Sequence, residues 1–193
     1  MSFRVLVVPE DPTYNGYILK PIAERMLVEC GRARASVEVL TSPRVRGYES
    51  AKRLLEEQIL DRYAHYDLLL FLSDSDGKDR SADFERLEAI ARAKGRVLLC
   101  CAAVQEVEAW LLAGHLDKLS KGWREIREDV AVKEVVFRPF LVQHGDPRRA
   151  GGGRDVLMEE ALRSYRGILQ RCPELAALEN RIRAIVEAQP PGD

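Results

Sequence analysis

Short apolar runs alternate with segments of helical periodicity over the first half of the chain. Continuous apolar runs are typical of strands that are buried on both faces of a parallel sheet. Apolar residues that recur every three to four positions predict amphipathic helices. We expect strands at residues 4–8, 36–40, 67–73 and 97–104. We expect helices at residues 17–30, 50–63 and 81–95.

This alternation of strand and helix predicts an α/β fold, with right-handed crossovers and a Rossmannoid parallel sheet flanked by helices. We expect the α/β domain to span residues 1–114. A mixed to helical C-terminal extension, residues 115–193, is expected to pack on it. Gly31 and Gly95 are placed to end the first and third helices, and Ser81 to cap the third.

The pattern changes after Val104, where long apolar runs no longer occur. We expect a short helix at residues 106–114 with Trp110 packed inward, and a strand at residues 135–137. The run Gly151-Gly152-Gly153 predicts a flexible, exposed loop. Further expected elements are two helices, at residues 156–170 and 174–188, and a frayed tail at Pro190-Pro191-Gly192.

Composition and charge narrow the class of protein without naming a function. A length of 193 residues suits one domain with an ample core. Hydrophobic residues make up 46% of the chain and charged residues 32%, which is ordinary for a soluble globular protein. A formal net charge of −1 does not predict strong nonspecific attraction to nucleic acid. No apolar run approaches the roughly 18 residues of a membrane helix. The chain enters a strand pattern without a signal peptide, so we expect a cytoplasmic protein.

The four cysteines do not form a Cys-x-x-Cys pair, which argues against structural zinc. Cys100 and Cys101 lie inside an apolar run and are expected to be small buried hydrophobes. Disulfides are not needed at this chain length, and a reducing compartment fits this cysteine usage.

Carboxylates follow three of the predicted strands. Asp74 and Asp76 come after the apolar run of residues 68–72. Glu10 and Asp11 follow the first strand, and Glu106 and Glu108 follow the fourth. In a doubly wound sheet, ligands bind beyond the carboxyl ends of the strands, so we expect these groups at one edge. If the strand continues, the side chains of Asp74 and Asp76 point the same way.

A hard divalent cation is the interpretation that best explains such a constellation. Like charges this close raise one another's pKa unless a cation neutralises them. Oxygen-only ligands favour Mg²⁺ or Mn²⁺, and one ion or two ions about 4 Å apart are compatible with the number of carboxylates.

Simpler explanations remain open. Asp and Ser favour turns because their side chains hydrogen-bond to the backbone, so residues 74–77 are also compatible with a plain turn. Glu106 and Glu108 are equally compatible with a solvated helix face. A calcium EF-hand is excluded because Lys78 would stand at its fifth position. The chain contains no phosphate-binding P-loop, nucleophile elbow or dinucleotide fingerprint, and its three histidines are scattered.

The order of these motifs resembles a known superfamily. A Glu after the first strand and Asp74-Ser75-Asp76 after a later apolar strand, in a βα-repeating domain, resemble the Toprim (topoisomerase–primase) superfamily. Residues 104–113 are similar to the Glu-x-Glu-Ala-Trp-Leu-Leu segment of bacterial RloB-like proteins related to the OLD nucleases. Gly151-Gly152-Gly153-Arg154 is similar to the C-terminal segment of that group. The resemblance spans residues 3–113 and, more loosely, reaches residue 180.

The resemblance implies magnesium-dependent phosphodiester chemistry. Glu10 would be a general acid/base or a metal ligand, and Asp74 and Asp76 would hold the metal. Glu106 or Glu108 would supply a further ligand. One departure concerns Glu10: the glutamate of the superfamily is usually followed by Gly, whereas Asp11 and Pro12 follow it here, so we expect Asp11 to share its role.

The leading hypothesis is a Mg²⁺- or Mn²⁺-dependent nuclease that acts on DNA or RNA, in phage defence beside a partner ATPase as in related systems. The candidate substrate-binding residues are Asp11, Lys78, Arg148 and Arg154, with Arg80 and Arg149 as further cations. The alternatives are a noncatalytic nucleotide- or phosphate-binding sensor and an interaction protein. The expected ligand is nucleic acid or a nucleotide. We do not expect the protein to bind a membrane, and we consider a homodimer as its assembly.

Overall fold

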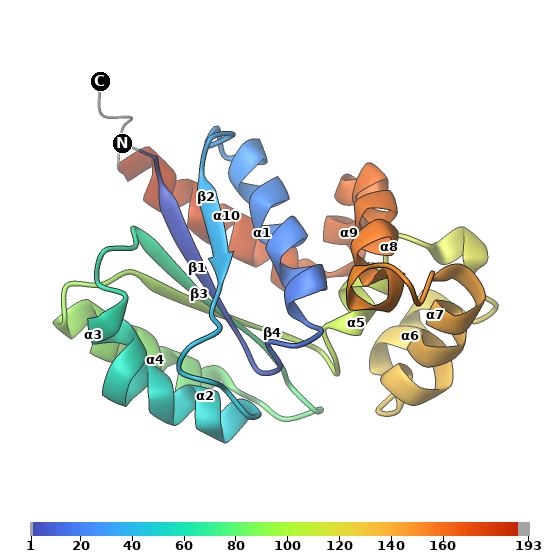
Figure 1. The fold of residues 1–193 in the computed structure, drawn as a ribbon, viewed down its shortest axis with the longest axis horizontal. Helices are drawn as coiled ribbons and strands as arrows, with labels where there is room; N and C mark the ends of the chain where they lie inside the picture. The colour runs from blue at the N-terminus through green and yellow to red at the C-terminus, as the bar shows by residue number, and fades with distance from the viewer. Residues whose placement is uncertain (1, 189–193) are drawn as a thin grey trace.

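Four parallel strands form one sheet, in the order β2-β1-β3-β4. The computed structural model describes residues 2–188 (Figure 1). The strands are β1 (Arg4–Pro9), β2 (Ser36–Val39), β3 (Leu68–Asp74) and β4 (Leu98–Ala103). Because β3 pairs with β1 on one side and with β4 on the other, it lies in the middle of the sheet. The predicted α/β fold with a parallel sheet flanked by helices is confirmed.

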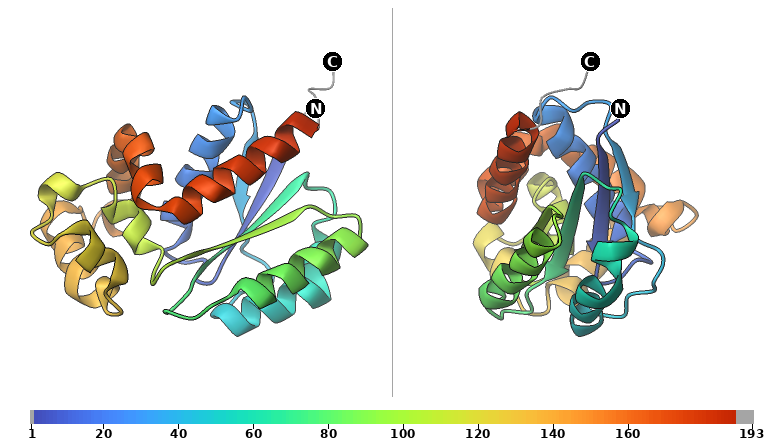
Figure 2. Two further views of the ribbon diagram at one scale, coloured as in Figure 1. Left: turned by 180° about the vertical axis from the view of Figure 1, so that it is seen from behind. Right: turned by 90° about the vertical axis from the view of Figure 1, so that its left-hand side faces the viewer.

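Both faces of the sheet are buried under helices. Val5 and Leu70 lie in one hydrophobic cluster, which includes residues of α1 (Gly16–Glu29) and α10 (Pro173–Ala188). Leu6 and Phe71 lie in a second cluster on the opposite face. Figure 2 shows α10 and α4 (Ser81–Ala93) on opposite sides of the sheet. This two-sided burial explains the uninterrupted apolar runs, because successive side chains of a strand point to opposite faces.

The helices of the first half match the expected segments, with one irregularity. The segment expected at residues 50–63 consists of α2 (Tyr48–Leu54), a π-helical turn η1 (Leu55–Ile59) and α3 (Leu60–Arg62). Gly31 and Gly95 follow α1 and α4 with positive φ of 81° and 68°, a conformation in which glycine ends a helix without strain.

The cap predicted for α4 is wrong. Ser81 is the first residue of the helix, Arg80 stands at the N-cap, and no side chain caps the helix there. Instead, the Asp79 carboxylate accepts a hydrogen bond from the Ser81 backbone N–H at 2.9 Å. The Asp79 side chain can accept this bond because the chain turns directly before the helix.

After β4, the described residues form helices and connecting loops, with no strand. α5 (Glu108–Leu112) still lies within the expected α/β domain. The elements of the extension are η2 (Leu116–Lys118), α6 (Trp123–Glu128), η3 (Lys133–Phe137), α7 (Arg138–His144), η4 (Ala150–Gly153), α8 (Arg154–Ala161), η5 (Leu162–Ser164), α9 (Tyr165–Arg171) and α10. The strand predicted at residues 135–137 is wrong, since these residues belong to the π-helix η3. Val132, Val136 and Phe140 are buried there at helical spacing. The helix expected at residues 156–170 is divided by the 3₁₀ turn η5.

The glycine run before α8 is not an exposed loop, so this prediction is also wrong. Gly153 is buried, and all three glycines have positive φ, between 61° and 90°. A Cβ atom on Gly151 would lie 2.5 Å from the Tyr17 ring, and one on Gly153 would lie 2.5 Å from the Asp146 backbone nitrogen. Glycine is therefore required by close packing against α1 and the preceding loop, which fixes where Arg154 begins α8.

The extension shares its core with the sheet. Trp110 of α5 is 1% exposed, and its indole N–H donates to the Glu174 carboxylate of α10 at 3.0 Å. Residues of α5, α8 and α10 belong to the same hydrophobic cluster as Val5 and Leu70. All four cysteines are buried free thiols, and the burial expected for Cys100 and Cys101 is confirmed. The tail at Pro190-Pro191-Gly192 lies outside the described residues.

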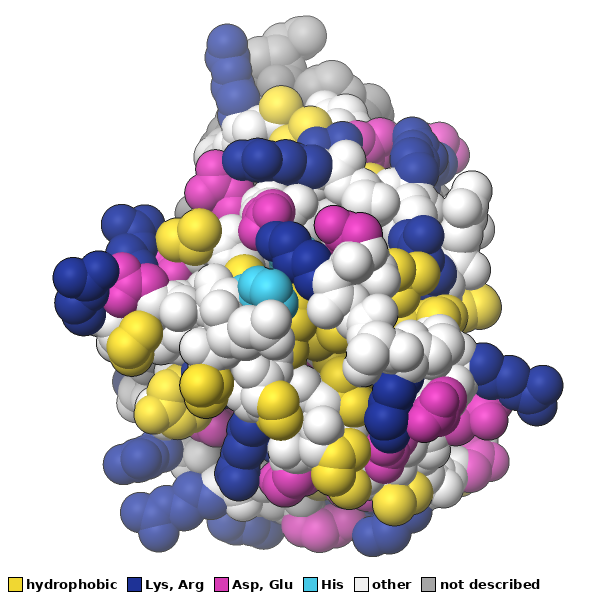
Figure 3. All heavy atoms as spheres, turned by 90° about the vertical axis from the view of Figure 1, so that its right-hand side faces the viewer, with side chains coloured by type: hydrophobic (Ala, Val, Ile, Leu, Met, Phe, Trp, Pro, Cys, Tyr) yellow, Lys and Arg dark blue, Asp and Glu magenta, His cyan; other side chains and the backbone are white. Residues whose placement is uncertain are grey.

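The surface of the extension mixes charges of both signs. Figure 3 shows lysine and arginine side chains interspersed with acidic and hydrophobic ones on this side of the molecule. Val135 and Val142 are among the large hydrophobic residues exposed there. A surface of mixed sign generates no broad positive field, in keeping with the net charge of −1. Among the helices of residues 2–188, none is long and apolar enough to span a membrane.

Candidate functional site

The carboxyl ends of β1 and β3 are joined through two acidic residues. The side chain of Asp74, the last residue of β3, is buried, and its Oδ1 accepts a hydrogen bond from the Val107 N–H at 2.8 Å. Glu10 follows β1, and its Oε1 accepts from the Asp74 N–H at 3.0 Å. The loop after β4, which contains Val107, is thereby tied to both strands. Neighbouring parallel strands place these groups together, as the sequence predicts.

Three carboxylates converge at this edge. One oxygen each from Asp74, Glu106 and Glu108 lies within 4.8 Å of the others. Glu108 begins α5, and its side chain is only 1% exposed. Neither of its carboxylate oxygens has a hydrogen-bond partner. Burying an ionised carboxylate without such partners is costly, so the donor set is suited to a cation. This acidic triad can hold a metal ion.

A lysine from the extension lies against the triad. The Lys133 ammonium of η3 donates a hydrogen bond to Glu106 Oε2 at 3.1 Å. It also lies 3.2 Å from Glu108 Oε1, close enough for an ion pair but without hydrogen-bond geometry. Lys133 brings one positive charge to two of the three carboxylates of the triad.

Three carboxyl groups of the site, those of Asp74, Glu10 and Glu106, have raised pKa values. Burial, followed by the negative charges of Glu106 and Glu10, raises the pKa of Asp74 to about 8. Burial raises the pKa of Glu10 to about 7, although the hydrogen bond from the Asp74 N–H opposes the shift. Burial also raises the pKa of Glu106, against the lowering effect of Lys133. Burial lowers the pKa of Lys133, but Glu108 and Glu106 outweigh it and raise the pKa overall. Without a cation these shifts favour the protonated carboxyl groups, so a bound cation would favour their ionised forms.

Asp76 does not belong to the triad. The expectation that Asp74 and Asp76 point the same way fails because β3 ends at Asp74 and Asp76 has a positive φ of 51°. The Ser75 hydroxyl accepts from the Gly77 N–H at 3.1 Å and donates to the Val104 carbonyl, so residues 74–77 do form a turn. The Asp76 side chain is 52% exposed and pairs with Arg80 at 3.3 Å.

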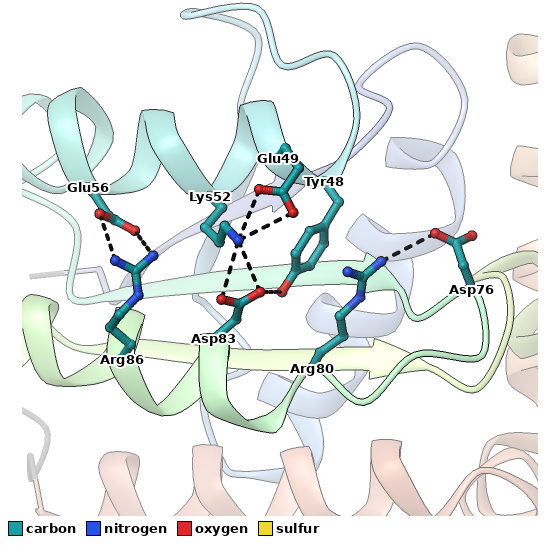
Figure 4. A network of polar contacts seen from close by, with 8 residues as sticks. All are labelled: Tyr48, Glu49, Lys52, Glu56, Asp76, Arg80, Asp83 and Arg86. Carbon is teal, nitrogen blue, oxygen red and sulfur yellow. Dashed lines mark hydrogen bonds and ion pairs between the residues drawn. The ribbon is translucent and has the colours of Figure 1, made fainter.

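Arg80 connects Asp76 to a polar network between α2 and α4 (Figure 4). The Arg80 guanidinium lies 3.7 Å from the centre of the Tyr48 ring. The Tyr48 hydroxyl donates to Asp83, which also receives hydrogen bonds from Lys52. Asp76 nevertheless remains near enough for its charge to raise the pKa of Glu10. The structure thus places Asp76 on the rim of the site, beside Glu10.

The predicted substrate-binding residues are dispersed. Asp11 Oδ1 accepts from the Thr13 N–H at 2.8 Å and stabilises the turn after β1. Lys78 is exposed in the loop before α4. Arg148 pairs with Asp146 at 3.0 Å, and its side chain is 89% exposed on the loop after α7. The structure does not bring Arg148 to the triad.

Arg154 has a more constrained position. Its guanidinium lies 4.6 Å from the centre of the Tyr14 ring and 5.1 Å from that of Phe137, and it donates to the Gly151 carbonyl at 2.6 Å. Burial lowers the pKa of Arg154, while the charge of Glu108 opposes the shift. Arg154 is therefore a half-buried cation on the side of the site formed by the extension.

Sequence reasoning did not identify Lys133. Lys133 is a single lysine in a segment of mixed apolar and charged residues, and it is not part of a recognisable motif. The spacing of Val132, Val136 and Phe140 is the signal that could have indicated it. Apolar residues four positions apart predict a helix through this segment, and it is in a helical segment that Lys133 reaches the site.

The fold and the site define a class of protein: an α/β protein with a four-stranded parallel sheet and a carboxylate triad at the carboxyl ends of its strands. No family model, no curated protein and no solved structure matches the chain. The resemblance to the Toprim superfamily accordingly depends on the sequence motifs alone.

Proposed function

We propose that the protein is a metal-dependent nuclease that hydrolyses phosphodiester bonds in DNA or RNA, with Mg²⁺ or Mn²⁺ held by Asp74, Glu106 and Glu108. The observation that carries the proposal is the buried Glu108 carboxylate, which lacks hydrogen-bond partners and lies within 4.8 Å of the other two ligand oxygens. The triad consists of oxygen donors only, and hard cations such as Mg²⁺ and Mn²⁺ prefer such donors. A single ion fits these three carboxylates.

The surrounding residues suit phosphodiester chemistry. A divalent ion at the triad would neutralise phosphate charge and lower the pKa of a bound water. Glu10 has a pKa of about 7, so it can accept or donate a proton near neutral pH as a general acid/base. Its Oε1 is fixed by the Asp74 N–H at 3.0 Å. Arg154 supplies a cation for substrate phosphate on the side of the extension.

The test is a cleavage assay with isosteric variants. Plasmid, single-stranded DNA and RNA are incubated with the purified protein in Mg²⁺, Mn²⁺ or EDTA. We expect cleavage that requires the metal and falls at least about 100-fold in Asp74→Asn and Glu108→Gln, since each removes one ligand charge. Asn at position 74 retains an Oδ1 acceptor for the Val107 N–H, so the fold is expected to survive.

Asp61→Asn is the matched control. Asp61 belongs to α3 and forms an ion pair with Lys94 at the surface. Because α3 precedes β3, Asp61 lies near the amino end of that strand, whereas Asp74 lies at its carboxyl end. Cleavage that persists in EDTA, or that survives in both triad variants, would show that the nuclease assignment is incorrect.

The position of Lys133 beside the triad supports a second candidate function, that of a noncatalytic nucleotide- or phosphate-binding sensor. Its ammonium contacts Glu106 and Glu108 and so serves as a built-in counter-ion for the pocket. Binding of a nucleotide in EDTA without turnover, unchanged in Asp74→Asn, would support the sensor. The association with phage defence and a partner ATPase, which the resemblance implies, belongs to the nuclease proposal and is tested by copurification.

A further inference from the structure

A groove adjoins the acidic site on the side of β2. It runs between the loop after β1 and the loop between β2 and α2, and has Glu10, Pro12, Arg44 and Arg46 among its lining residues. Glu10 therefore belongs both to this groove and, through its bond to the Asp74 N–H, to the acidic site. Glu10 thus links the groove to Asp74 of the triad.

The loop that carries the two arginines is fixed in place. Val45, between them, is 3% exposed and packs in the cluster on the α2 face of the sheet. The Gly47 N–H donates to the Glu10 backbone carbonyl at 3.1 Å, and Gly47 has a φ of 82°, which suits glycine. Because Val45 points inward, Arg44 and Arg46 are both exposed beside the groove.

In the described part of the chain, Arg44 and Arg46 differ from most other lysine and arginine residues in their lack of side-chain partners. Many lysine and arginine side chains are paired with carboxylates, as Arg86 is with Glu56 at 2.5 Å. Within residues 2–188, neither the Arg44 nor the Arg46 guanidinium makes an ion pair, a side-chain hydrogen bond or a ring contact. An arginine without an internal partner retains its full capacity for bidentate contact with phosphate.

We propose that this groove binds backbone phosphates of a polynucleotide strand whose scissile phosphate lies at the triad, and that Arg44 and Arg46 make these contacts. The inference rests on the proposed nuclease function and deepens it. A nucleoside monophosphate at the triad would have no phosphate beyond it, whereas a strand would continue past Glu10 into the groove. The substrate class is therefore a nucleic acid strand and not a nucleoside monophosphate.

The charge of the groove supports this assignment. Its acidic residues are Glu10 and Asp11, and Asp11 is engaged by the Thr13 N–H. The Glu10 carboxylate is engaged by the Asp74 N–H. Both carboxylates of the groove therefore have partners other than the two guanidinium groups, which are left to contact phosphate although the net charge of the chain is −1.

The experiment measures strand binding separately from cleavage. A fluorescent single-stranded oligonucleotide is titrated with the protein in EDTA, by anisotropy, over a series of salt concentrations. The double variant Arg44→Gln/Arg46→Gln is compared with Arg34→Gln/Arg92→Gln. Arg34 and Arg92 are also exposed and lie before β2 and at the end of α4, near the amino ends of the strands. Each double variant removes two positive charges.

We expect the groove variant to raise the Kd for the oligonucleotide at least about tenfold over the control variant and to reduce the salt slope by about 1.4, for two phosphate contacts. Mononucleotide and orthophosphate are expected to compete poorly. Equal Kd values for the two double variants, no binding by the wild type, or full displacement by orthophosphate would overturn the inference. Since no metal is present, these outcomes leave the cleavage test of Asp74 and Glu108 to judge the nuclease proposal independently.

Discussion

The Lys133 ammonium lies 3.2 Å from Glu108, a carboxylate that is 1% exposed at the end of the parallel sheet. The same ammonium contacts Glu106 at 3.1 Å, and Asp74 adds a third carboxyl group to the cluster. Lys133 comes from a π-helical segment of the extension, and π-helical turns occur frequently at functional sites. Lysine and a divalent cation would therefore compete for the same carboxylates.

Replacement of this lysine tests the competition. We expect Lys133→Met to lower the free energy of unfolding in EDTA by about 1–3 kcal/mol, less than the cost of breaking a fully buried pair because Lys133 is partly exposed. The same variant is expected to bind Mn²⁺ about tenfold more tightly, since no ammonium has to be displaced. Urea unfolding and calorimetric titration measure the two effects.

Lys121→Met is the control for this variant. Lys121 forms an exposed pair with Glu125 on α6, so its loss is expected to change neither quantity appreciably. If both lysine variants have the wild-type affinity for Mn²⁺, Lys133 is not a competitor of the metal.

Stability in the absence of metal is expected to fall as pH rises. Burial raises the pKa of Asp74 to about 8 and of Glu10 to about 7. Unfolded carboxyls titrate near pH 4, so the folded state binds more protons between about pH 4 and pH 8. The free energy of unfolding therefore decreases across this window, and the contribution is fully present only below it.

Thermal unfolding in EDTA at about pH 5.5 and about pH 8.5 measures this dependence. Asp74→Asn is expected to flatten it, because the amide does not titrate. Mn²⁺ is expected to restore stability at the higher pH, since metal binding favours deprotonated ligands. A protein in EDTA that is more stable at the higher pH, with an unchanged slope in Asp74→Asn, would contradict the expectation.

The two aspartates of the motif are expected to differ in metal binding. Asp74 is buried within the triad, whereas Asp76 is 52% exposed and pairs with Arg80. We expect Asp74→Asn to weaken Mn²⁺ binding at least about 100-fold and Asp76→Asn to change it by less than about threefold, since only the first removes a ligand charge. Electron paramagnetic resonance of free Mn²⁺ gives both affinities. Equal losses would place Asp76 among the ligands.

Docking of α8 onto α5 depends on one glycine. A Cβ atom on Gly114 would lie 2.6 Å from the Ala161 Cα and 2.8 Å from its carbonyl oxygen. We expect Gly114→Ala to destabilise the protein by about 1–3 kcal/mol, because backbone has to move apart. Gly122→Ala is the control, since nothing lies within 4 Å of that position. Urea unfolding compares the two, and equal midpoints would show that the helices adjust freely.

The sequence predicts the sheet and its helical cover because both depend on local pattern. Residues 68–72 are apolar without interruption, and in the structure they form a strand buried on both faces. The same logic places Glu10, Asp74 and Glu106 at one edge, because parallel strands end on the same side. The π-helix η3 is the clearest failure: its three apolar residues at positions 135–137 match a short strand as well as a helix.

The sequence alone determined which carboxylates follow the strands at the carboxyl edge, since strand pattern and parallel order fix that much. Tertiary structure decided what each one does there. The turn at Ser75 directs Asp76 toward Arg80, and η3 brings Lys133 to Glu106 and Glu108. The physical reason is that burial, charge pairing and the approach of distant segments arise only when the chain is folded.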